Sequence, residues 1–139
     1  ALLHAPVHPR TLDDPHHVLQ VAVRVLVGQL QHDPGGCDPA ALHALKANVA
    51  ALRAGKRTRI FKQDALRYIG RLPEAAYDIA LADPPWGSKQ TERLVQRWID
   101  VPFARALAIE HAADHRLPGR GRTRVRGDAA ITLYIGATA

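Results

Sequence analysis

The chain has 139 residues, which is the size of one domain with a single hydrophobic core. Nineteen Lys and Arg face thirteen Asp and Glu, giving a formal net charge of +6, and a basic balance of this kind indicates a polyanionic partner. Biased base composition in the coding sequence would produce the same excess of arginine. One cysteine excludes an internal disulfide, no apolar run approaches the ~20 residues of a membrane span, and the eight histidines lack zinc-ligand spacing. We therefore expect neither a membrane nor a metal.

The first half of the chain contains one strand candidate and one helix. Val18–Val27 is rich in β-branched residues and predicts a strand. Asp38 suits the N-cap of a helix, Pro39 its first position, and Gly55 its end. Apolar residues mark one face of this helix, namely Leu42, Leu45, Val49 and Leu52.

Strands and helices then alternate. The predicted strands are Thr58–Lys62, Tyr77–Asp83 and Ala104–Glu110, and the predicted helices are Ala65–Arg71 and Lys89–Asp100. Gly127-Asp128 predicts a hairpin between Arg122–Arg126 and Ala129–Ile135. This order predicts an α/β fold with a mostly parallel, doubly wound sheet and a C-terminal antiparallel hairpin. Ligands of such sheets bind beyond the carboxyl ends of strands, where the sequence places Asp64, Asp83 and Glu110.

The tetrapeptide Asp83-Pro84-Pro85-Trp86 follows the apolar strand Tyr77–Asp83 and carries most of the chemical information. The amino group of a nucleobase is a poor nucleophile, and a carboxylate with a backbone carbonyl can accept its N–H groups and orient it. Proline fixes φ and holds the preceding residue extended, while an aromatic ring can stack on a base taken out of its helix. The alternative is a strand that ends at a Pro-Pro turn with a core tryptophan.

Five arginines lie within eleven residues, from Arg116 to Arg126. In a strand, Arg122, Arg124 and Arg126 would share one face, with Thr123 and Val125 on the other. Such a stripe could bind RNA phosphates, or it could be a solvated edge that charge protects from aggregation. We take six cations as candidate nucleic-acid contacts: Lys89, Arg93, Arg120, Arg122, Arg124 and Arg126.

Four stretches of the segment from Asp38 to Gly136 together resemble the class I S-adenosylmethionine-dependent methyltransferases. Within that class, the segment is most similar to the bacterial family that methylates N2 of a guanine in 16S ribosomal RNA. The stretches are Asp38–Val49, Gln63–Leu66, Asp78–Trp86, and the last core strand with the hairpin, Ala108–His111 and Gly127–Tyr134. Tyr or Phe is more usual than Trp86 at the last motif position. The Asp-Pro-Pro-aromatic motif alone is shared with amino-methylating DNA enzymes, and its combination with the hairpin points to the ribosomal family.

The resemblance implies a Rossmann-like fold, S-adenosylmethionine as the cofactor, and ribosomal RNA or the small ribosomal subunit as the partner of a cytoplasmic, monomeric enzyme. It implies that Asp83, Pro84, Pro85 and Trp86 are catalytic, with Asp83 and the Pro84 carbonyl accepting from the guanine amino group. It also implies cofactor binding by Asp64, with Ala65 and Asp38 as further candidates. We expect Asp64 and Asp83 to lie at neighbouring strand ends.

Residues 1–37 do not match the family, so we divide the chain into this unmatched segment and a methyltransferase-like domain over 38–139. No G-x-G turn follows Val27, and only about ten residues separate it from Asp38, where a βα unit with a second strand needs roughly thirty. The sequence therefore predicts an N-terminally incomplete fold. Two alternatives stay open: a non-catalytic RNA-binding remnant, and an N6-adenine or N4-cytosine DNA methyltransferase.

Overall fold

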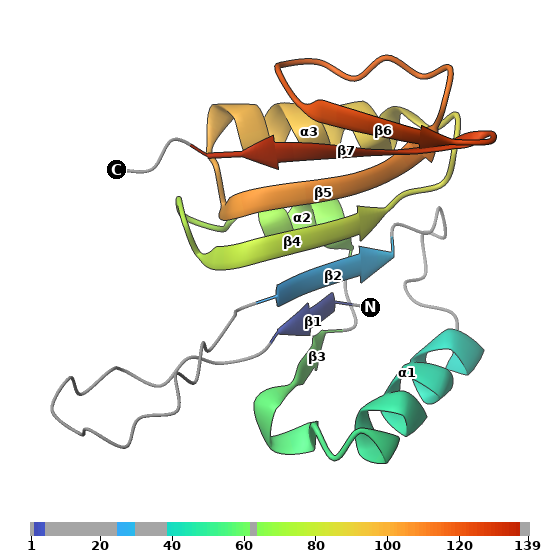
Figure 1. Ribbon diagram of the computed structural model, residues 1–139. Helices are drawn as coiled ribbons and strands as arrows, with labels where there is room; N and C mark the ends of the chain where they lie inside the picture. Colours follow the sequence, from blue (N-terminus) through green and yellow to red (C-terminus); the bar gives the residue numbers. More distant parts are fainter. Residues whose placement is uncertain (1, 5–24, 30–38, 62–63, 137–139) are drawn as a thin grey trace, which may run out of the picture.

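The computed structural model describes residues 2–4, 25–29, 39–61 and 64–136. Within them, seven strands form one sheet in the order β3-β1-β2-β4-β5-β7-β6. The strands are β1 (Leu2–His4), β2 (Val25–Gln29), β3 (Arg59–Phe61), β4 (Tyr77–Asp83), β5 (Ala104–Ala112), β6 (Arg122–Arg126) and β7 (Ala129–Ile135). The helices are α1 (Pro39–Ala51), the 3₁₀ turn η1 (Gly55–Arg57), α2 (Ala65–Ile69) and α3 (Lys89–Asp100). Figure 1 shows α2 and α3 behind the sheet and α1 below it.

The centre of the sheet is parallel and both of its sides are antiparallel. β2 pairs with β4 and β4 with β5 in parallel, whereas β7 runs antiparallel to β5 and β6. On the other side, β1 runs antiparallel to both β2 and β3. The α/β sheet and the C-terminal antiparallel hairpin are confirmed, and β1 is a second antiparallel strand, which was not predicted. Residues 2–4 are too few to show a periodicity, so nothing local predicts this strand.

Four elements have the predicted bounds: β4, α3, β6 and β7. In α3 the buried residues are Thr91, Leu94, Val95 and Trp98, which is the spacing of one helix face. β3 begins one residue after the predicted Thr58, and the predicted end of that strand at Lys62 lies outside the described residues. α2 is shorter than the predicted Ala65–Arg71, and β5 extends two residues beyond Glu110. Of the predicted strand Val18–Val27, residues 18–24 lie outside the described residues, and the described part belongs to β2.

The predicted end of the first helix at Gly55 is wrong, because α1 ends at Ala51. Arg53 takes a left-handed φ of 51°. The N–H of Ala54 donates to the Val49 carbonyl at 3.0 Å and that of Arg53 to the Ala50 carbonyl at 2.9 Å. These are the two bonds of a Schellman motif, which usually has glycine at the position that Arg53 occupies. The N-cap predicted at Asp38 lies outside the described residues.

The core lies between the sheet and the pair α2 and α3. Its largest buried side chains are aromatic and aliphatic: Tyr77, Tyr134, Phe103, Leu107 and Ile109. Trp98 packs on Tyr134 with ring centroids 5.6 Å apart, and its indole N–H donates to the Ala104 carbonyl at 2.8 Å. This buried hydrogen bond satisfies the polar end of the ring and joins α3 to the start of β5.

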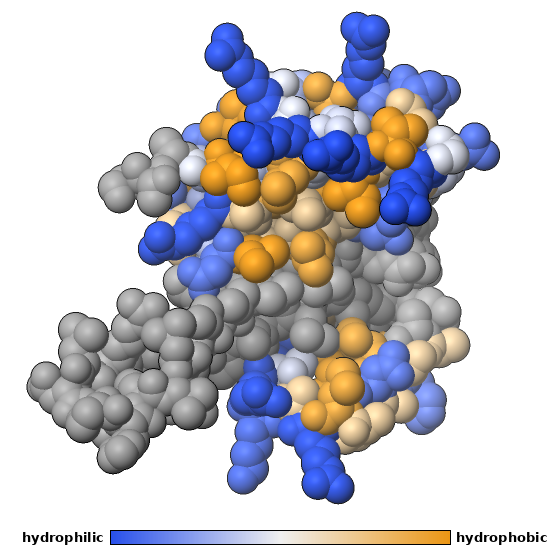
Figure 2. All heavy atoms as spheres, in the orientation of Figure 1, coloured by the Kyte–Doolittle hydropathy of each residue, from blue (hydrophilic) through white to orange (hydrophobic). Residues whose placement is uncertain are grey.

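The opposite face of the sheet is the one seen in Figure 2, where apolar side chains gather between basic ones. Residues paired across neighbouring strands share a face of the sheet. The register pairs Leu81 of β4 with Ala108 of β5, and Ala108 with Leu133 of β7. Leu81 and Leu133 are 43 % and 37 % exposed, so this face is not covered as the α3 side is.

Candidate functional site

The Asp83–Trp86 motif lies where β4 leaves the sheet. Asp83, the last residue of the strand, is exposed, Pro84 is buried and Pro85 is half-buried. Trp86 is 48 % exposed, so its ring is not a core side chain. The interpretation of Trp86 as a core tryptophan after a Pro-Pro turn is therefore wrong. Pro84 anchors the turn, and the carboxylate and the aromatic ring on either side of the prolines are open to a ligand.

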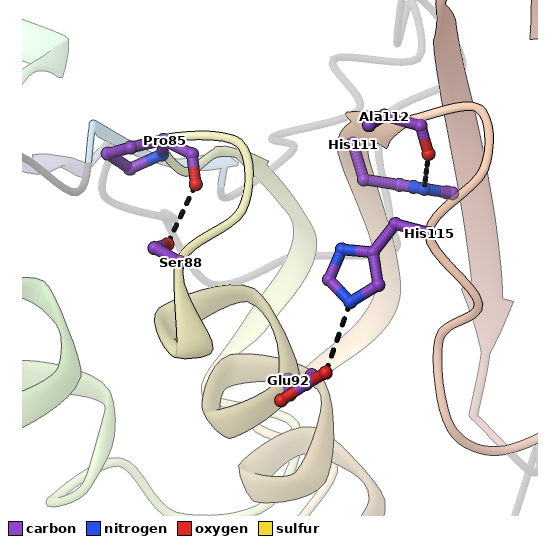
Figure 3. Close-up of polar contacts among 6 residues, drawn as sticks. All are labelled: Pro85, Ser88, Glu92, His111, Ala112 and His115. Atoms are coloured by element: carbon purple, nitrogen blue, oxygen red, sulfur yellow. Dashed lines mark hydrogen bonds and ion pairs between the residues drawn. The ribbon is translucent and has the colours of Figure 1, made fainter.

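A tight turn fixes the backbone directly after the prolines. The Pro85 carbonyl accepts from the Ser88 hydroxyl at 2.7 Å (Figure 3). It also accepts from the Ser88 N–H at 3.3 Å. Gly87 has a φ of 73°, a left-handed conformation that glycine adopts without strain. Within the described residues no donor reaches the Pro84 carbonyl. Of the two proline carbonyls, that of Pro84 is thus the one left to accept from a ligand.

The first turn of α3 is connected to the segment that follows β5. Glu92 of α3 pairs with His115, whose Nε2 lies 3.1 Å from Glu92 Oε1 (Figure 3). His115 in turn lies edge-on to His111, with ring centroids 6.2 Å apart. These contacts hold the helix that begins three residues after Trp86.

His111 is buried and both of its ring nitrogens have partners. Nδ1 lies 2.8 Å from the Ala112 carbonyl, and Nε2 lies 2.7 Å from the Thr132 hydroxyl, which lies 2.8 Å from that of Thr123. A carbonyl only accepts, so Nδ1 carries the proton and Nε2 of a neutral ring accepts from Thr132. His111 therefore has a structural role, and no metal-binding cluster of three or more residues occurs in the described part of the chain.

Asp64 lies at the same end of the sheet as Asp83, but the prediction of neighbouring strands is wrong. β1 and β2 lie between β3, which precedes Asp64, and β4. The two strands are three inter-strand spacings apart, or roughly 14 Å. Both point the same way, since β1 is antiparallel to β3 and β2, and β2 is parallel to β4. The carboxylates of Asp64 and Asp83 thus lie at the same edge of the sheet but too far apart to contact the same atom of a ligand.

The three candidate cofactor residues, Asp64, Ala65 and Asp38, differ in how much of each can contact a ligand. Asp64 caps α2, with Oδ1 accepting from the Arg67 N–H at 2.7 Å, so its second oxygen is the one available to a ligand. Ala65 is 8 % exposed and packs in the core, which leaves only its backbone for binding. Asp38 lies outside the described residues.

The predicted cations occupy separate places. Lys89 and Arg93 are exposed on the first half of α3, and Arg120 is exposed before β6. Arg122, Arg124 and Arg126 share one face of β6, as predicted, and pair in register with Leu133, Ile131 and Ala129. Thr123, on the other face, hydrogen-bonds to Thr132 on the α3 side. Only Arg126 of the stripe lies near the carboxyl ends of the central strands, because its partner Ala129 pairs with Ala112 at the end of β5.

Three residues at the site were not found from the sequence. Ser88 locks the turn, Gln29 at the end of β2 lies beside Asp83 in the register, and Gln90 Oε1 is a buried polar atom with no partner among the described residues. The only signal for Ser88 and Gln90 is that they are polar and close after the motif. The position of Gln29 depends on long-range pairing and has no local signal.

No family model and no curated protein matches the chain. Solved structures do. A candidate methylase of Haemophilus influenzae superposes with a TM-score of 0.60 at 17 % identity, over 70 % of this chain and 67 % of its own. A candidate methyltransferase of Escherichia coli gives 0.56 at 23 % identity, over 70 % and 58 %. A hypothetical protein of Thermus thermophilus gives 0.57 at 24 % identity, over 81 % and 61 %.

The chain therefore spans roughly three-fifths to two-thirds of the length of these structures. Within the described residues no helix is long and apolar enough to cross a membrane. The sheet, its helices and the likeness to the candidate methylases together show a Rossmann-like α/β fold of the methyltransferase type.

Proposed function

We propose that this chain is a methyltransferase domain that transfers a methyl group from S-adenosylmethionine to the amino group of a nucleobase, guanine N2 of 16S ribosomal RNA. One observation carries the proposal. At the end of a central strand of a methyltransferase-type fold, one fixed turn holds the exposed Asp83 carboxylate, the half-exposed Trp86 ring and the Pro84 carbonyl, which no donor of the described residues reaches.

In this arrangement Trp86 provides a stacking surface for a base taken out of its helix. Asp83 and the Pro84 carbonyl accept from the two N–H groups of the guanine amino nitrogen. These bonds orient the nitrogen lone pair toward the methyl donor, so that positioning and electrostatics supply most of the rate increase. The nitrogen bears a positive charge once it is methylated and then loses a proton, for which no strong base is needed.

S-adenosylmethionine supplies an electrophilic methyl group when it is bound. The described residues fit its adenine end, because the free oxygen of Asp64 can accept from an adenine amino group and the backbone of Ala65 adjoins it. Asp64 and Asp83 lie at one edge of the sheet, on either side of the end of β2. A ligand extended along this edge could contact both residues.

The RNA would be held by phosphate contacts, which position a nucleic acid without reading its sequence. Lys89, Arg93 and Arg126 are the candidates nearest to the carboxyl ends of the strands. Arg120, Arg122 and Arg124 lie farther along and would bind a longer RNA segment. The partner is then ribosomal RNA, alone or in the small ribosomal subunit.

Transfer of labelled methyl to 16S ribosomal RNA tests the proposal, with Asp83→Asn as the diagnostic variant. The amide keeps the shape of the side chain and loses the charge that orients the amino group, so we expect the rate to fall by ~10²–10³. Asp100→Asn, at the far end of α3, is the matched control and should retain the rate. No transfer by the unaltered chain, together with salt-dependent RNA binding, would favour the non-catalytic RNA-binding alternative. Equal rates for Asp83→Asn and the control would remove Asp83 from the mechanism.

A further inference from the structure

A second carboxylate, that of Glu110 on the neighbouring strand, lies beside the carboxylate of Asp83. β4 and β5 run in parallel, and the last residues paired in their register are Ala82 and Ile109. Asp83 and Glu110 come directly after this pair, so their backbones lie side by side, one inter-strand spacing or ~5 Å apart. Ile109 is buried in the core on the α3 side. Because side chains alternate along a strand, the Cβ atoms of Asp83 and Glu110 both point to the opposite face.

The backbone of Glu110 is fixed, but its carboxylate has no partner among the described residues. Glu110 pairs with Ile131 of β7 on its other side, so that strands hold it from both directions. The next residue, His111, points to the α3 side, and both of its ring nitrogens bond within the fold. Within the described part of the chain, no hydrogen bond or ion pair involves the Glu110 side chain. Two carboxylates at this spacing repel each other, and a ligand with two adjacent donors would relieve that repulsion.

Guanine has two adjacent donors on the edge that carries its amino group. The amino nitrogen N2 and the ring N1–H are attached to the same carbon, and both donate in the plane of the base. An ionised carboxylate only accepts, so Glu110 suits the N1–H as Asp83 suits the amino group. Adenine and cytosine have an unprotonated ring nitrogen next to their amino groups, and a carboxylate repels its lone pair. A carboxylate at this position therefore favours guanine over the two other bases that carry an amino group.

We propose that Glu110 selects guanine by accepting a hydrogen bond from the N1–H of the base whose amino group Asp83 holds. The inference rests on the proposed function, since Asp83 and Trp86 set the position of the base. It adds the residue that excludes adenine and cytosine. Enzymes that take a base out of its helix read it on this same edge. A site built to bond an N–H discriminates strongly against an analogue without it, because the buried acceptor is then left unpaired.

Two RNA hairpins that differ in one unpaired loop purine test the proposal. The purine is guanosine in the first hairpin and 2-aminopurine riboside in the second. 2-Aminopurine keeps the amino group that Asp83 would bind, but it has a lone pair in place of the N1–H and lacks the guanine O6. In fluorescence anisotropy with dye-labelled RNA, we expect the unaltered chain to bind the guanosine hairpin at least about tenfold more tightly, the effect of one hydrogen bond to a charged group.

Glu110→Gln then shows whether the carboxylate is the cause of this preference. The amide has the same size, and it can accept from the N1–H through its oxygen or donate to the lone pair of 2-aminopurine through its nitrogen. We therefore expect the preference for guanosine to disappear almost completely. Glu74→Gln makes the same chemical change at an exposed residue before the start of β4, at the far end of that strand, and should keep the preference.

The quantity to compare is the ratio of the two dissociation constants for each variant. Removing a negative charge strengthens the binding of both hairpins by a similar factor, because they carry the same phosphates. A merely structural role of Glu110 would also change both affinities together and leave the ratio as it is. Equal affinity of the unaltered chain for the two hairpins, or an unchanged ratio in Glu110→Gln, would overturn the proposal.

Methyl transfer to 16S ribosomal RNA separates this inference from the proposed function. If the unaltered chain transfers no methyl group but loses its preference for guanosine in Glu110→Gln, the proposed function fails, and Glu110 is the guanine-selecting residue of a non-catalytic RNA-binding domain. If the chain methylates guanine N2 and Glu110→Gln keeps the preference, the proposed function stands and Glu110 has no part in base recognition.

Discussion

Trp86 is best understood by comparison with the second tryptophan of the chain. Of the two, Trp98 is buried against Tyr134 while Trp86 is 48 % exposed next to Asp83. The indole N–H of Trp98 donates to the Ala104 carbonyl, and the ring is part of the core. Trp86 contributes little to the core, and its ring is open to a ligand.

Trp86→Ala should therefore weaken RNA binding while leaving the fold intact. Removing an aromatic ring that stacks on a base costs roughly 1–3 kcal/mol of binding free energy. We expect the KM for RNA in methyl transfer to rise accordingly, and the urea midpoint of unfolding to change little. Trp86→Phe keeps a stacking surface and should retain most of the affinity. An RNA affinity of Trp86→Ala equal to that of the unaltered chain would mean that the ring is not the stacking surface.

At the residue scale the sequence identifies the motif but not its environment. Asp83 through Trp86 are contiguous, so their proximity follows from the chain itself. The bond from Ser88 to the Pro85 carbonyl, and the lack of a donor to the Pro84 carbonyl among the described residues, depend on the actual turn geometry. The separation of Asp64 from Asp83 depends on two strands that insert between β3 and β4. One of these, β1, is three residues long and pairs with partners far along the chain.

The sequence predicts the exact first and last residues of those elements for which two local sequence signals agree. β6 and β7 flank a Gly-Asp turn, and Gly127 indeed has the positive φ that such a turn requires. α3 combines a clear apolar spacing with a start just after a Pro-Pro turn. α1 has only a glycine as its end signal, and the helix ends earlier because Arg53 accepts a left-handed conformation.

The tightest glycine site of the described chain lies directly before the hairpin. A Cβ on Gly121, the residue before β6, would lie 2.3 Å from Thr132 Cγ2 and 3.0 Å from the Tyr134 ring. Gly121→Ala should thus displace β6 or the Tyr134 ring and lower the free energy of unfolding by ~1–3 kcal/mol, the usual effect of overpacking. Urea denaturation measures the loss.

Gly55→Ala is the matched control, because a Cβ there meets nothing within 4 Å. It should leave the urea midpoint nearly unchanged. A Gly121→Ala variant as stable as this control would show that β6 shifts freely, and hence that the β6 arginines are not held in a fixed stripe.

For the molecule as a whole, alkaline pH should act through Tyr134. Burial disfavours the phenolate and raises the pKa of this tyrosine above its ordinary value. In the unfolded chain the phenol ionises near pH ~10, and in the folded chain only at higher pH. The stability that the neutral phenol contributes is therefore complete below pH ~10, and it is lost as pH rises through the folded pKa.

Tyr134→Phe tests this link between pH and stability. It removes the hydroxyl that donates to the Pro118 carbonyl at 2.8 Å, so we expect a loss of ~1 kcal/mol at neutral pH. Above pH ~10 the variant should lose stability less steeply than the unaltered chain, because it has no phenol to ionise at this position. Urea midpoints measured at several pH values provide the comparison. Parallel curves for the two proteins would mean that Tyr134 does not titrate with unfolding.

The ladder lengths of the sheet have a consequence for cooperativity. β5 and β7 are paired over seven residues, whereas β1 is paired with β2 over two and with β3 over three. We expect the short ladders to open well before the long ones, as separate units of amide hydrogen exchange.

Asp64 nevertheless belongs to the part of the molecule that we expect to exchange slowly. It caps α2, whose Ala65 and Ile69 are buried in the core, and Arg97 of α3 donates to the carbonyls that follow, those of Ile69, Gly70 and Leu72. The Asp64 carboxylate would keep its place while the amides of β3, the strand that leads to it, exchange. Asp64 and Asp83 would then belong to one folding unit, although β1, one of the two strands between them, does not.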